Sequence, residues 1–331
     1  MATLKEIATK VNVSITTVSR VLNNDTSLSV GPDVRKKIIK TATTMGYKTP
    51  RNRVRLKSNF KLNIAIIHWN AIDDDTNSHY LLAKRSIDQL SIKSNVNTLH
   101  LYKEDGEYNI DILESIDGLI CIGKFSRNHI LSFEKVSKNI VFIDSSPNES
   151  KFDSVMFDLN ASVREILSTL IDRGYKKIGY IGGVEEISLT VKLGRKRELI
   201  FRDYLFQKNM LESKYIHIGS MTSESGYKLM KKILEKSEKA EVYVCSNDSI
   251  ALGALRAINE AGLNVPKDIG IIGFNNEDMS EYTFPPLTSV DVNGQFIGEQ
   301  ALISLLERIE GRNIPIKKII PTKIIFRQSI K

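Results

Sequence analysis

The sequence has few cysteines, few histidines and no long apolar run. Its two cysteines, Cys121 and Cys245, stand far apart and match no metal-ligand spacing, which is typical of buried thiols in a reducing cytoplasm. The five histidines form no HxxxH or HExxH pattern, so we expect no metal site. No apolar stretch approaches the roughly 20 residues that span a bilayer. Charged residues also interrupt the N-terminus too early for a signal peptide. We therefore predict a cytoplasmic protein with no membrane partner.

Motifs of catalysis are also missing. The glycines at 179–183 and 270–273 mark turns, but neither segment follows the GxGxxG or GxxxxGK[ST] pattern of nucleotide-binding loops. The sequence contains no GxSxG nucleophile elbow either. We therefore expect neither an enzyme nor a bound cofactor.

Positive charge is concentrated at the N-terminus. The 331 residues suggest two or three domains, and the net charge is +8. Residues 1–58 hold 12 lysines and arginines against 3 acidic residues, whereas the other 273 residues hold 35 against 36. Such a basic module is typical of polyanion binding. A solvated basic tail would have the same composition, so the decision depends on whether the segment folds.

Helix signals fill this basic segment. Thr3 and Glu6 have the spacing of a capping box, and the apolar residues that follow recur at helical intervals up to Val11. Ser14 can cap a second helix that runs to about Asn23. A third helix is predicted to start near Gly31-Pro32-Asp33 and to stop at Gly46, with four apolar residues, Val34, Ile38, Ala42 and Met45.

Three short helices, the first two joined by a tight turn, predict a helix-turn-helix. On the second helix Val18, Val21 and Leu22 share one face, and Thr16 and Arg20 lie opposite. Arginine pairs with guanine in the major groove, and threonine contacts base edges or a thymine methyl. A solvated surface charge is the alternative for Arg20. Ile15 lies at the border of the two faces, where plain packing is the alternative to base contact.

The run VSITTVSRVLN, residues 13–23, preceded by the LxxIA pattern at 4–8, resembles the lactose/galactose repressor family. The resemblance implies that Ile15, Thr16 and Arg20 read bases. It also implies phosphate or positioning contacts from four residues, Thr17, Ser19, Asn23 and Tyr47. Ser14 completes this predicted DNA-binding set. The partner would be double-stranded operator DNA with a pseudo-palindromic sequence, bound by a homodimer.

Residues 48–61 form the predicted hinge between a head, 1–47, and a core, 62–331. In the family a leucine of this hinge wedges into the minor groove, and Leu56 stands nine residues after Tyr47. The usual Ala-Arg pair before that leucine is replaced by Arg53-Val54. A plain linker hydrophobe is therefore the alternative for Leu56.

From residue 62 on, β-rich runs alternate with helical stretches, which predicts parallel sheets with helices on both faces. The expected strands are 63–68, 96–101, 118–122, 140–144, 177–181, 241–245 and 269–274. The expected helices are 81–92, 162–173, 227–236 and 250–261. Several segments, among them 158–183 and 246–254, resemble the periplasmic-binding-protein-like core of the same repressors. The resemblance implies an α/β core of two lobes with chain crossings near residues 160, 291 and 320.

The resemblance implies a small-molecule effector, expected to be a sugar, and six residues are candidates for binding it: Trp69, Asp144, Arg197, Met221, Asn247 and Asn275. The family's ligand-binding asparagine falls on Asn247, although a helix cap is its alternative and Asp248 suits a cap better. Arg197 matches a ligand-binding arginine, with a surface ion pair as its alternative. Asp144 ends a strand and can accept hydroxyl hydrogen bonds.

The other candidates depart from the family pattern or are ambiguous. Met221 occupies the place of an aromatic residue that stacks on sugar in many relatives. Trp69 can supply that apolar face instead, or can be ordinary core. Asn275 replaces an aspartate, so the effector of those relatives should not be transferred.

These features together predict a DNA-binding transcription regulator, a repressor of a sugar-utilisation operon that its effector releases. Two alternatives stay open: a regulator whose ligand promotes DNA binding, and a sugar-binding protein without a DNA role. The chain ends where the family's core stops, with no heptad segment after it, so we expect a dimer.

Overall fold

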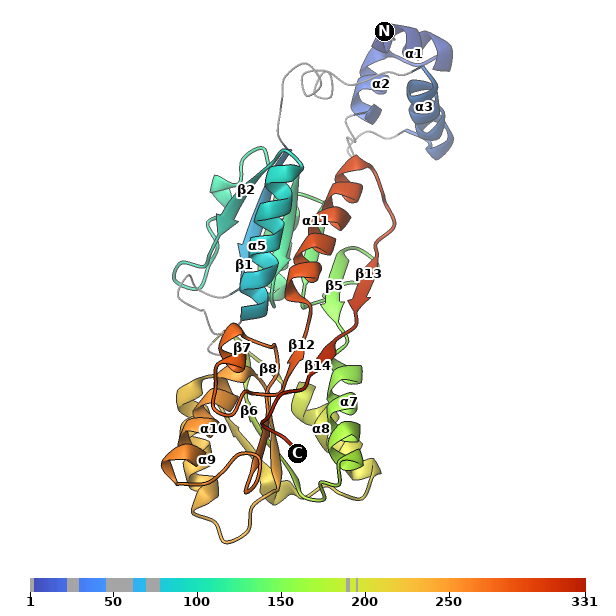
Figure 1. The fold of residues 1–331 in the computed structure, drawn as a ribbon. Coiled ribbons are helices and arrows are strands. Elements are labelled where there is room, and N and C mark those ends of the chain that lie inside the picture. The colour runs from blue at the N-terminus through green and yellow to red at the C-terminus, as the bar shows by residue number, and fades with distance from the viewer. Residues whose placement is uncertain (1–2, 23–29, 46–61, 70–77, 189–190, 195) are drawn as a thin grey trace. The chain divides into compact units, whose positions relative to one another are not determined.

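The computed structural model describes residues 3–22, 30–45, 62–69, 78–188, 191–194 and 196–331. Contacts divide the chain into a small unit, Met1–Lys61, and a large unit, Leu62–Lys331 (Figure 1). Each unit has its own apolar core.

The described part of the small unit contains three helices, α1 (Leu4–Val11), α2 (Ile15–Leu22) and α3 (Pro32–Thr44). The capping box is confirmed: the Thr3 amide donates to Glu6 Oε2 at 2.8 Å, and the Glu6 amide donates to Thr3 Oγ1 at 3.2 Å. Asn12 ends α1 in the left-handed conformation, with φ of 59°. The Ser14 hydroxyl then accepts from the Thr17 amide at 3.0 Å and starts α2.

One fully buried residue from each helix, Ile7, Val18 and Ile38, lies in the core of the small unit. Val34, expected to share the apolar side of the third helix, is 37% exposed and lies outside this core. The basic segment therefore contains a folded three-helix module, and a solvated tail is excluded for residues 3–22 and 30–45.

The large unit has two α/β lobes. The first lobe is a six-stranded parallel sheet in the order β13-β5-β4-β3-β1-β2. Its strands are β1 (Leu62–His68), β2 (Val96–Leu101), β3 (Gly118–Ile122), β4 (Ile140–Ile143), β5 (Asp153–Phe157) and β13 (Lys317–Ile320). Helices α5 (Ser78–Lys93) and α11 (Gly294–Glu310) pack together on one face (Figure 1), and α6 (Arg127–Val136) lies in the other layer. Alternate residues of β1 enter the two layers, Ile64 and Ile66 one, Ala65 and Ile67 the other.

The second lobe is a four-stranded parallel sheet in the order β11-β10-β6-β9. Its strands are β6 (Ile178–Gly183), β9 (Ile216–Gly219), β10 (Val242–Cys245) and β11 (Gly270–Ile272). Helix α7 (Leu159–Asp172) packs on α8 (Lys196–Gln207), and α9 (Ser223–Leu234) packs on α10 (Asp248–Glu260). A hairpin of β7 (Glu185–Ser188) and β8 (Val191–Gly194) precedes α8, and short 3-10 turns cover Ile110–Ile112, Ser213–Tyr215 and Asp278–Glu281.

The chain passes between the lobes three times: between β5 and α7, between β12 (Ser289–Asp291) and α11, and between β13 and β14 (Lys323–Ile325). Strands β12 and β14 pair antiparallel, which holds two of the crossings side by side (Figure 1). Side chains tie the three together, because the Asn293 amide group donates to the Pro321 carbonyl at 2.9 Å and the Ser162 and Thr322 hydroxyls are 2.8 Å apart.

A buried carboxylate organises the second lobe next to these crossings. Asp248, at the start of α10, accepts hydrogen bonds from the Ser289 hydroxyl at 2.6 Å, the Glu277 amide at 2.7 Å and the Ser280 hydroxyl at 2.9 Å. Burial raises the pKa of Asp248 to about 6, although these donors oppose the shift. Burial and the neighbouring Asp248 also raise the pKa of the Glu277 carboxyl to about 7.

Replacing Glu277 by Gln should therefore stabilise the core at alkaline pH. The folded-state pKa of about 7 lies above the ordinary 4.5, so the fold favours the protonated acid. That contribution is fully present below pH 4.5 and is lost as the pH rises through 7. We expect Glu277→Gln to raise the Tm at pH 8 and to leave it nearly unchanged at pH 4, below the unfolded-state pKa. Glu281→Gln, an exposed neighbour, is the control. An unchanged or lower Tm of Glu277→Gln at pH 8 would contradict this assignment.

Candidate functional site

The outer side of α2 is the candidate DNA-reading surface. Ile15 is 48% exposed, Thr16 is exposed, and Ser19 and Arg20 are half-buried, whereas Val18 and Val21 on the other side are buried. Ile15 is therefore not a core residue, which removes plain packing as its explanation. The residues predicted to read bases thus share one accessible side of a short helix.

Ser14 and Thr17 have a structural task in addition to any contact with DNA. Their hydroxyl oxygens are 2.8 Å apart, and the Ser14 oxygen also accepts from the Thr17 amide. This pair fixes the first turn of α2 and so the direction of the reading helix. The other predicted DNA contacts, Asn23, Tyr47 and Leu56, lie outside the described residues, as does the hinge.

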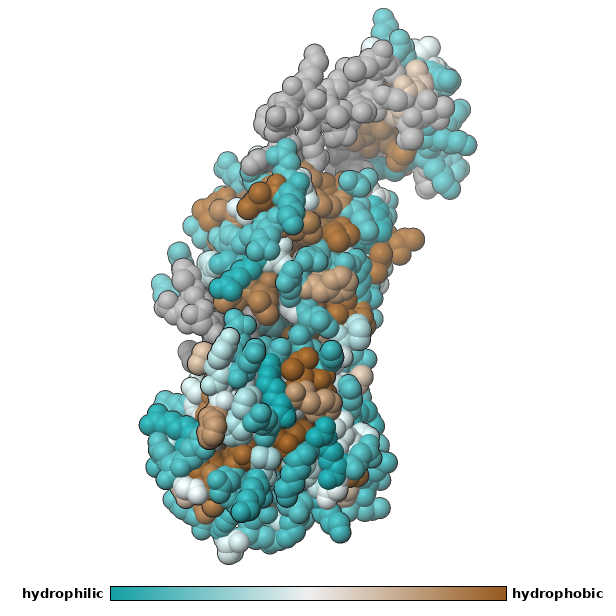
Figure 2. Space-filling view, in the orientation of Figure 1, coloured by the Kyte–Doolittle hydropathy of each residue, from teal (hydrophilic) through white to brown (hydrophobic). Residues whose placement is uncertain are grey.

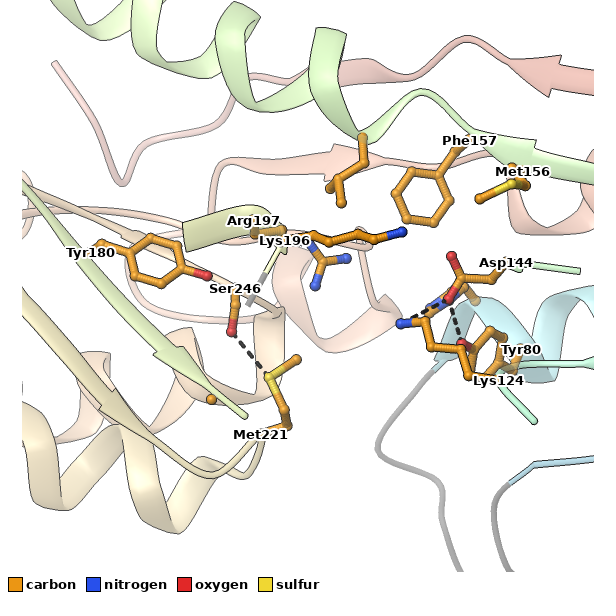
Figure 3. Close-up of a pocket in the computed structure, with 13 residues that line it drawn as sticks. Tyr80, Lys124, Asp144, Met156, Phe157, Tyr180, Lys196, Arg197, Met221 and Ser246 are labelled. Atoms are coloured by element: carbon orange, nitrogen blue, oxygen red, sulfur yellow. Dashed lines mark hydrogen bonds and ion pairs between the residues drawn. The ribbon is translucent and has the colours of Figure 1, made fainter. Parts of the chain in front are cut away.

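A cavity opens between the two lobes of the large unit (Figure 3). It is lined by His79, Tyr80, Lys124, Asp144, Met156, Phe157, Leu159, Tyr180, Gly183, Lys196, Arg197, Met221 and Ser246. Most of these residues follow strands or start helices, as expected where ligands bind at the carboxyl ends of parallel strands. Three of the six predicted effector residues, Asp144, Arg197 and Met221, are among them.

Asp144 is the one carboxylate among the described residues that line the cavity. It accepts a hydrogen bond from the Tyr80 hydroxyl at 2.6 Å, and Lys124 Nζ lies 3.5 Å from the same oxygen. Burial acts to raise the pKa of Asp144, but Lys124, His79, Tyr80 and Arg197 outweigh it and hold the pKa below its usual range. Asp144 is therefore an ionised acceptor near neutral pH.

His79, from the first turn of α5, is buried against this carboxylate. Neither of its ring nitrogens has a hydrogen-bond partner among the described residues. Burial lowers the pKa of His79 to about 4; Asp144 opposes the shift, and Arg197 and Lys124 add to it. The ring is therefore neutral near pH 7 and presents one donor and one acceptor.

Arg197 and Met221 form part of the wall from the second lobe. The Arg197 guanidinium carbon lies 4.2 Å from the centre of the Phe274 ring, and the buried Arg197 Nε has no hydrogen-bond partner among the described residues. Met221 accepts a hydrogen bond from Ser246 at its sulfur, at 3.2 Å. Gly183 allows the backbone of Met221 to lie close to the end of β6, because a Cβ at position 183 would stand 2.7 Å from the Met221 amide nitrogen.

Asn247 supports the cavity from behind and is not among its lining residues. It is fully buried, caps α10 by accepting from the Ile250 amide at 2.9 Å, and donates to the Met221 carbonyl at 3.1 Å. The expectation that Asp248 would be the better cap is wrong, because Asp248 turns to Ser280 and Ser289 instead.

Trp69 and Asn275 are also absent from the described lining. Trp69 is half-buried against the apolar layer that contains α6, and its ring lies 5.6 Å from Lys124 Nζ. Asn275 is 2% exposed with φ of 104°, and its backbone amide donates to the Val290 carbonyl. Its side-chain oxygen is buried and has no partner among the described residues.

Sequence reasoning missed several lining residues, chiefly His79, Tyr80, Lys124, Tyr180 and Lys196. Lys124 follows β3 closely and Tyr180 lies within β6, so the rule that ligands bind at strand ends could have suggested both. Nothing in the local sequence distinguishes the His79-Tyr80 pair from other polar starts of helices.

No described helix is long and apolar enough to cross a membrane. On the face drawn in Figure 2, hydrophilic residues dominate the large unit and hydrophobic residues form separate patches. Within the described ranges, no group of three or more histidine, cysteine, aspartate or glutamate side chains is placed to hold a metal ion.

Comparison with known proteins matches both units. Residues 3–50 match the model of the bacterial regulatory proteins of the lacI family, and residues 167–330 match the periplasmic binding protein-like domain. The chain is 32% identical over 340 residues to the HTH-type transcriptional repressor MelR of Bacillus subtilis (strain 168), with 99% of this chain and 97% of that protein covered. It is 34% identical over 335 residues to the HTH-type transcriptional regulator GalR of Streptococcus thermophilus, with both chains fully covered.

Solved structures share the fold. A complex of the transcriptional regulator CelR with cellobiose matches with a TM-score of 0.69 at 20% identity, over 99% of this chain and 100% of that one. The Lac repressor dimer bound to operator and the anti-inducer ONPF matches with a TM-score of 0.68 at 23% identity, over 99% and 98%. The expected fold, a helix-turn-helix head with a two-lobed α/β core, is confirmed.

The structural task of Asn247 can be tested by Asn247→Ala. Loss of the cap and of the bond to the Met221 carbonyl should lower the free energy of unfolding of the core by about 2 kcal/mol. The measurement is urea denaturation, with Ser249→Ala as the control, because Ser249 makes only a 3.4 Å contact with Glu277. Unchanged stability combined with lost effector binding would instead make Asn247 a direct ligand contact.

Proposed function

Since the chain belongs to the lacI family of bacterial regulatory proteins, which regulate transcription by binding DNA, we propose that it represses a sugar-utilisation operon. A sugar effector bound between the lobes releases it from the operator. The observation that carries the proposal is the pairing of two parts in one chain, a folded basic head with an accessible reading helix and a polar cavity between two lobes.

Base reading is assigned to the outer side of α2. Arg20 and Thr16 can reach base edges in the major groove, with Ile15 placed for an apolar contact with a thymine methyl. Thr17 and Ser19, with Asn23 and Tyr47, take phosphate or positioning roles. Leu56 is proposed as the minor-groove wedge of the hinge.

A homodimer on a pseudo-palindromic operator suits this head, because two reading helices related by a two-fold axis fit successive major grooves. A Lac repressor dimer bound to operator shares the fold of this chain. We place the protein in the cytoplasm, where its DNA lies.

Effector binding would act through the three crossings. A ligand that contacts Asp144 from one lobe and Arg197 and Met221 from the other favours one arrangement of the lobes. The crossings transmit that preference toward the head as a coupling free energy, typically about 1–3 kcal/mol. A ligand that promotes DNA binding would use the same residues, and its coupling free energy would have the opposite sign. A sugar-binding protein without a DNA role would have no use for the head.

The cellobiose complex of the regulator CelR, which shares the fold of this chain, supports a sugar as effector. β-Galactosides and related disaccharides are the first class to test. A thermal-shift screen against a sugar panel, followed by operator-binding measurements with each hit, tests both the ligand and the sign of the switch. If a sugar that binds the protein tightens operator binding, release by the effector is refuted and the ligand promotes DNA binding instead.

Arg20→Ala should relax sequence discrimination. We expect a loss of about 1–3 kcal/mol in binding to the operator relative to an operator mutated at the contacted base pair. Fluorescence anisotropy with both DNA duplexes measures it. Lys37→Ala, an exposed lysine of α3, is the control and should change both affinities equally or not at all. If Arg20→Ala weakens both duplexes equally, Arg20 contacts phosphate and not a base.

Removing residues 1–58 should abolish specific DNA binding and leave ligand binding intact, because the large unit has its own core. Calorimetry with a hit from the screen and anisotropy with operator DNA test the two halves of this expectation. Specific DNA binding that survives the deletion would refute the assignment of the head.

A further inference from the structure

Resting on the proposed function, we propose that the effector is an acidic sugar derivative, whose phosphate or carboxylate group is bound by Lys196, Arg197 and His79. The two cations come from the first turn of α8, and the histidine comes from the first turn of α5 in the opposite lobe. An anion at this point would therefore contact both lobes.

Among the described residues, the charges that line the cavity do not balance. Three cationic residues, Lys124, Lys196 and Arg197, line it, and Asp144 is the one carboxylate of the described lining. Asp144 lies 3.5 Å from Lys124, so that carboxylate is already engaged by one cation and by Tyr80. Lys196 and Arg197, on the second-lobe side, make no hydrogen bond or ion pair with a carboxylate among the described residues, although Arg197 is near enough to help lower the pKa of Asp144. A neutral sugar would bring no charge to compensate them as the lobes close and exclude water.

Lys196 and Arg197 point into the cavity from the start of α8 (Figure 3). Among the described residues neither makes a hydrogen bond or an ion pair, and Arg197 Nε is buried. The aromatic face of Phe274 holds the guanidinium from one side, which fixes its plane. The positive end of the helix dipole of α8 adds to the attraction for an anion.

The ring of His79 lines the cavity from the first lobe. Its ring is buried, lines the cavity, and leaves both nitrogens without a partner among the described residues. A buried polar atom without a partner loses its bonds to water and gains none in return, so such an atom is expected where a ligand completes it. The neutral ring can donate one hydrogen bond to an anion oxygen without the cost of a third buried positive charge.

The remainder of the cavity suits the sugar ring. Asp144, Tyr180 and Ser246 offer acceptors and hydroxyl groups to sugar hydroxyls, and Phe157 and Met221 offer apolar faces.

Calorimetry on the full-length protein at constant ionic strength tests the proposal with matched pairs of ligands. The pairs are galactose with galactose 6-phosphate, glucose with glucose 6-phosphate, and galactose with galacturonate. We expect at least one acidic member to bind about tenfold or more tighter than its neutral parent, since a hydrogen bond to a charged group is stronger than one between neutral groups. A phosphate ester and a carboxylate are distinguished by which pair shows the preference.

Two variants identify the residues. Lys196→Gln and His79→Leu should each reduce affinity for the acidic sugar about tenfold and leave affinity for the neutral parent nearly unchanged. Lys208→Gln is the matched control, because it removes the same charge just beyond the opposite end of α8. Inorganic phosphate should compete with the acidic sugar on the wild-type protein and compete less on Lys196→Gln.

The outcomes separate this inference from the proposed function. If neutral sugars bind as tightly as acidic ones and release the operator, the acidic effector is refuted and the sugar-responsive repressor stands. If acidic sugars bind in a Lys196-dependent way and operator affinity stays constant, the anion site stands and release by this ligand fails. If no acidic sugar binds, or if Lys196→Gln and Lys208→Gln behave alike, the anion site is overturned.

Discussion

The pairing of β13 with β5 constrains everything else in the core. Residues near the end of the chain complete the sheet of the first lobe, so the chain must cross between the lobes three times. Three parallel connections prevent the lobes from separating and leave relative rotation as the motion they permit. Asp153, the first residue of β5, is fully buried and accepts from Arg308 at 2.8 Å and also from Arg312, which fixes α11 and the loop after it to that strand. The edge of the sheet is thus held by buried ion pairs.

Buried polar and charged groups have different surroundings in the Asp153 cluster and in the cavity between the lobes. Asp153 meets two guanidinium groups and the amide of Ile316, so its desolvation is offset by strong partners. In the cavity, His79 and Arg197 Nε have no partner among the described residues. The same chain that satisfies a carboxylate in the sheet leaves polar groups unsatisfied between the lobes. Arg308 Nε in the Asp153 cluster is also buried without a partner among the described residues, so His79 and Arg197 are distinguished by lining a cavity that a ligand can enter.

Local sequence signals predicted the elements with strong periodicity or caps. The capping box at Thr3 and the buried runs of β3 and β4 depend on neighbours in the chain, and they were found at the expected positions. Strand β9, α8 and α11 were missed, because β9 is only partly buried and the apolar residues of the two helices do not keep to one side. The site was harder to predict, since His79 and Lys196 become neighbours of one cavity only through tertiary folding. At Asn247 and Asp248 local propensity ranked the two caps wrongly, because the fold supplies Asp248 with three donors that sequence spacing does not reveal.

The concentration of positive charge in the head is visible in the sequence, and the positive side of the cavity is not. The core as a whole is almost neutral, so composition gives no hint of it. Yet α8 begins with two adjacent cations that face a cavity in which Asp144 is the one carboxylate of the described lining. The field inside a cleft depends on the few charges that line it, because the low-dielectric walls concentrate their effect. A chain can therefore attract a polyanion at one end and a small anion in its core by two unrelated distributions of charge, of which only the first follows from counting residues.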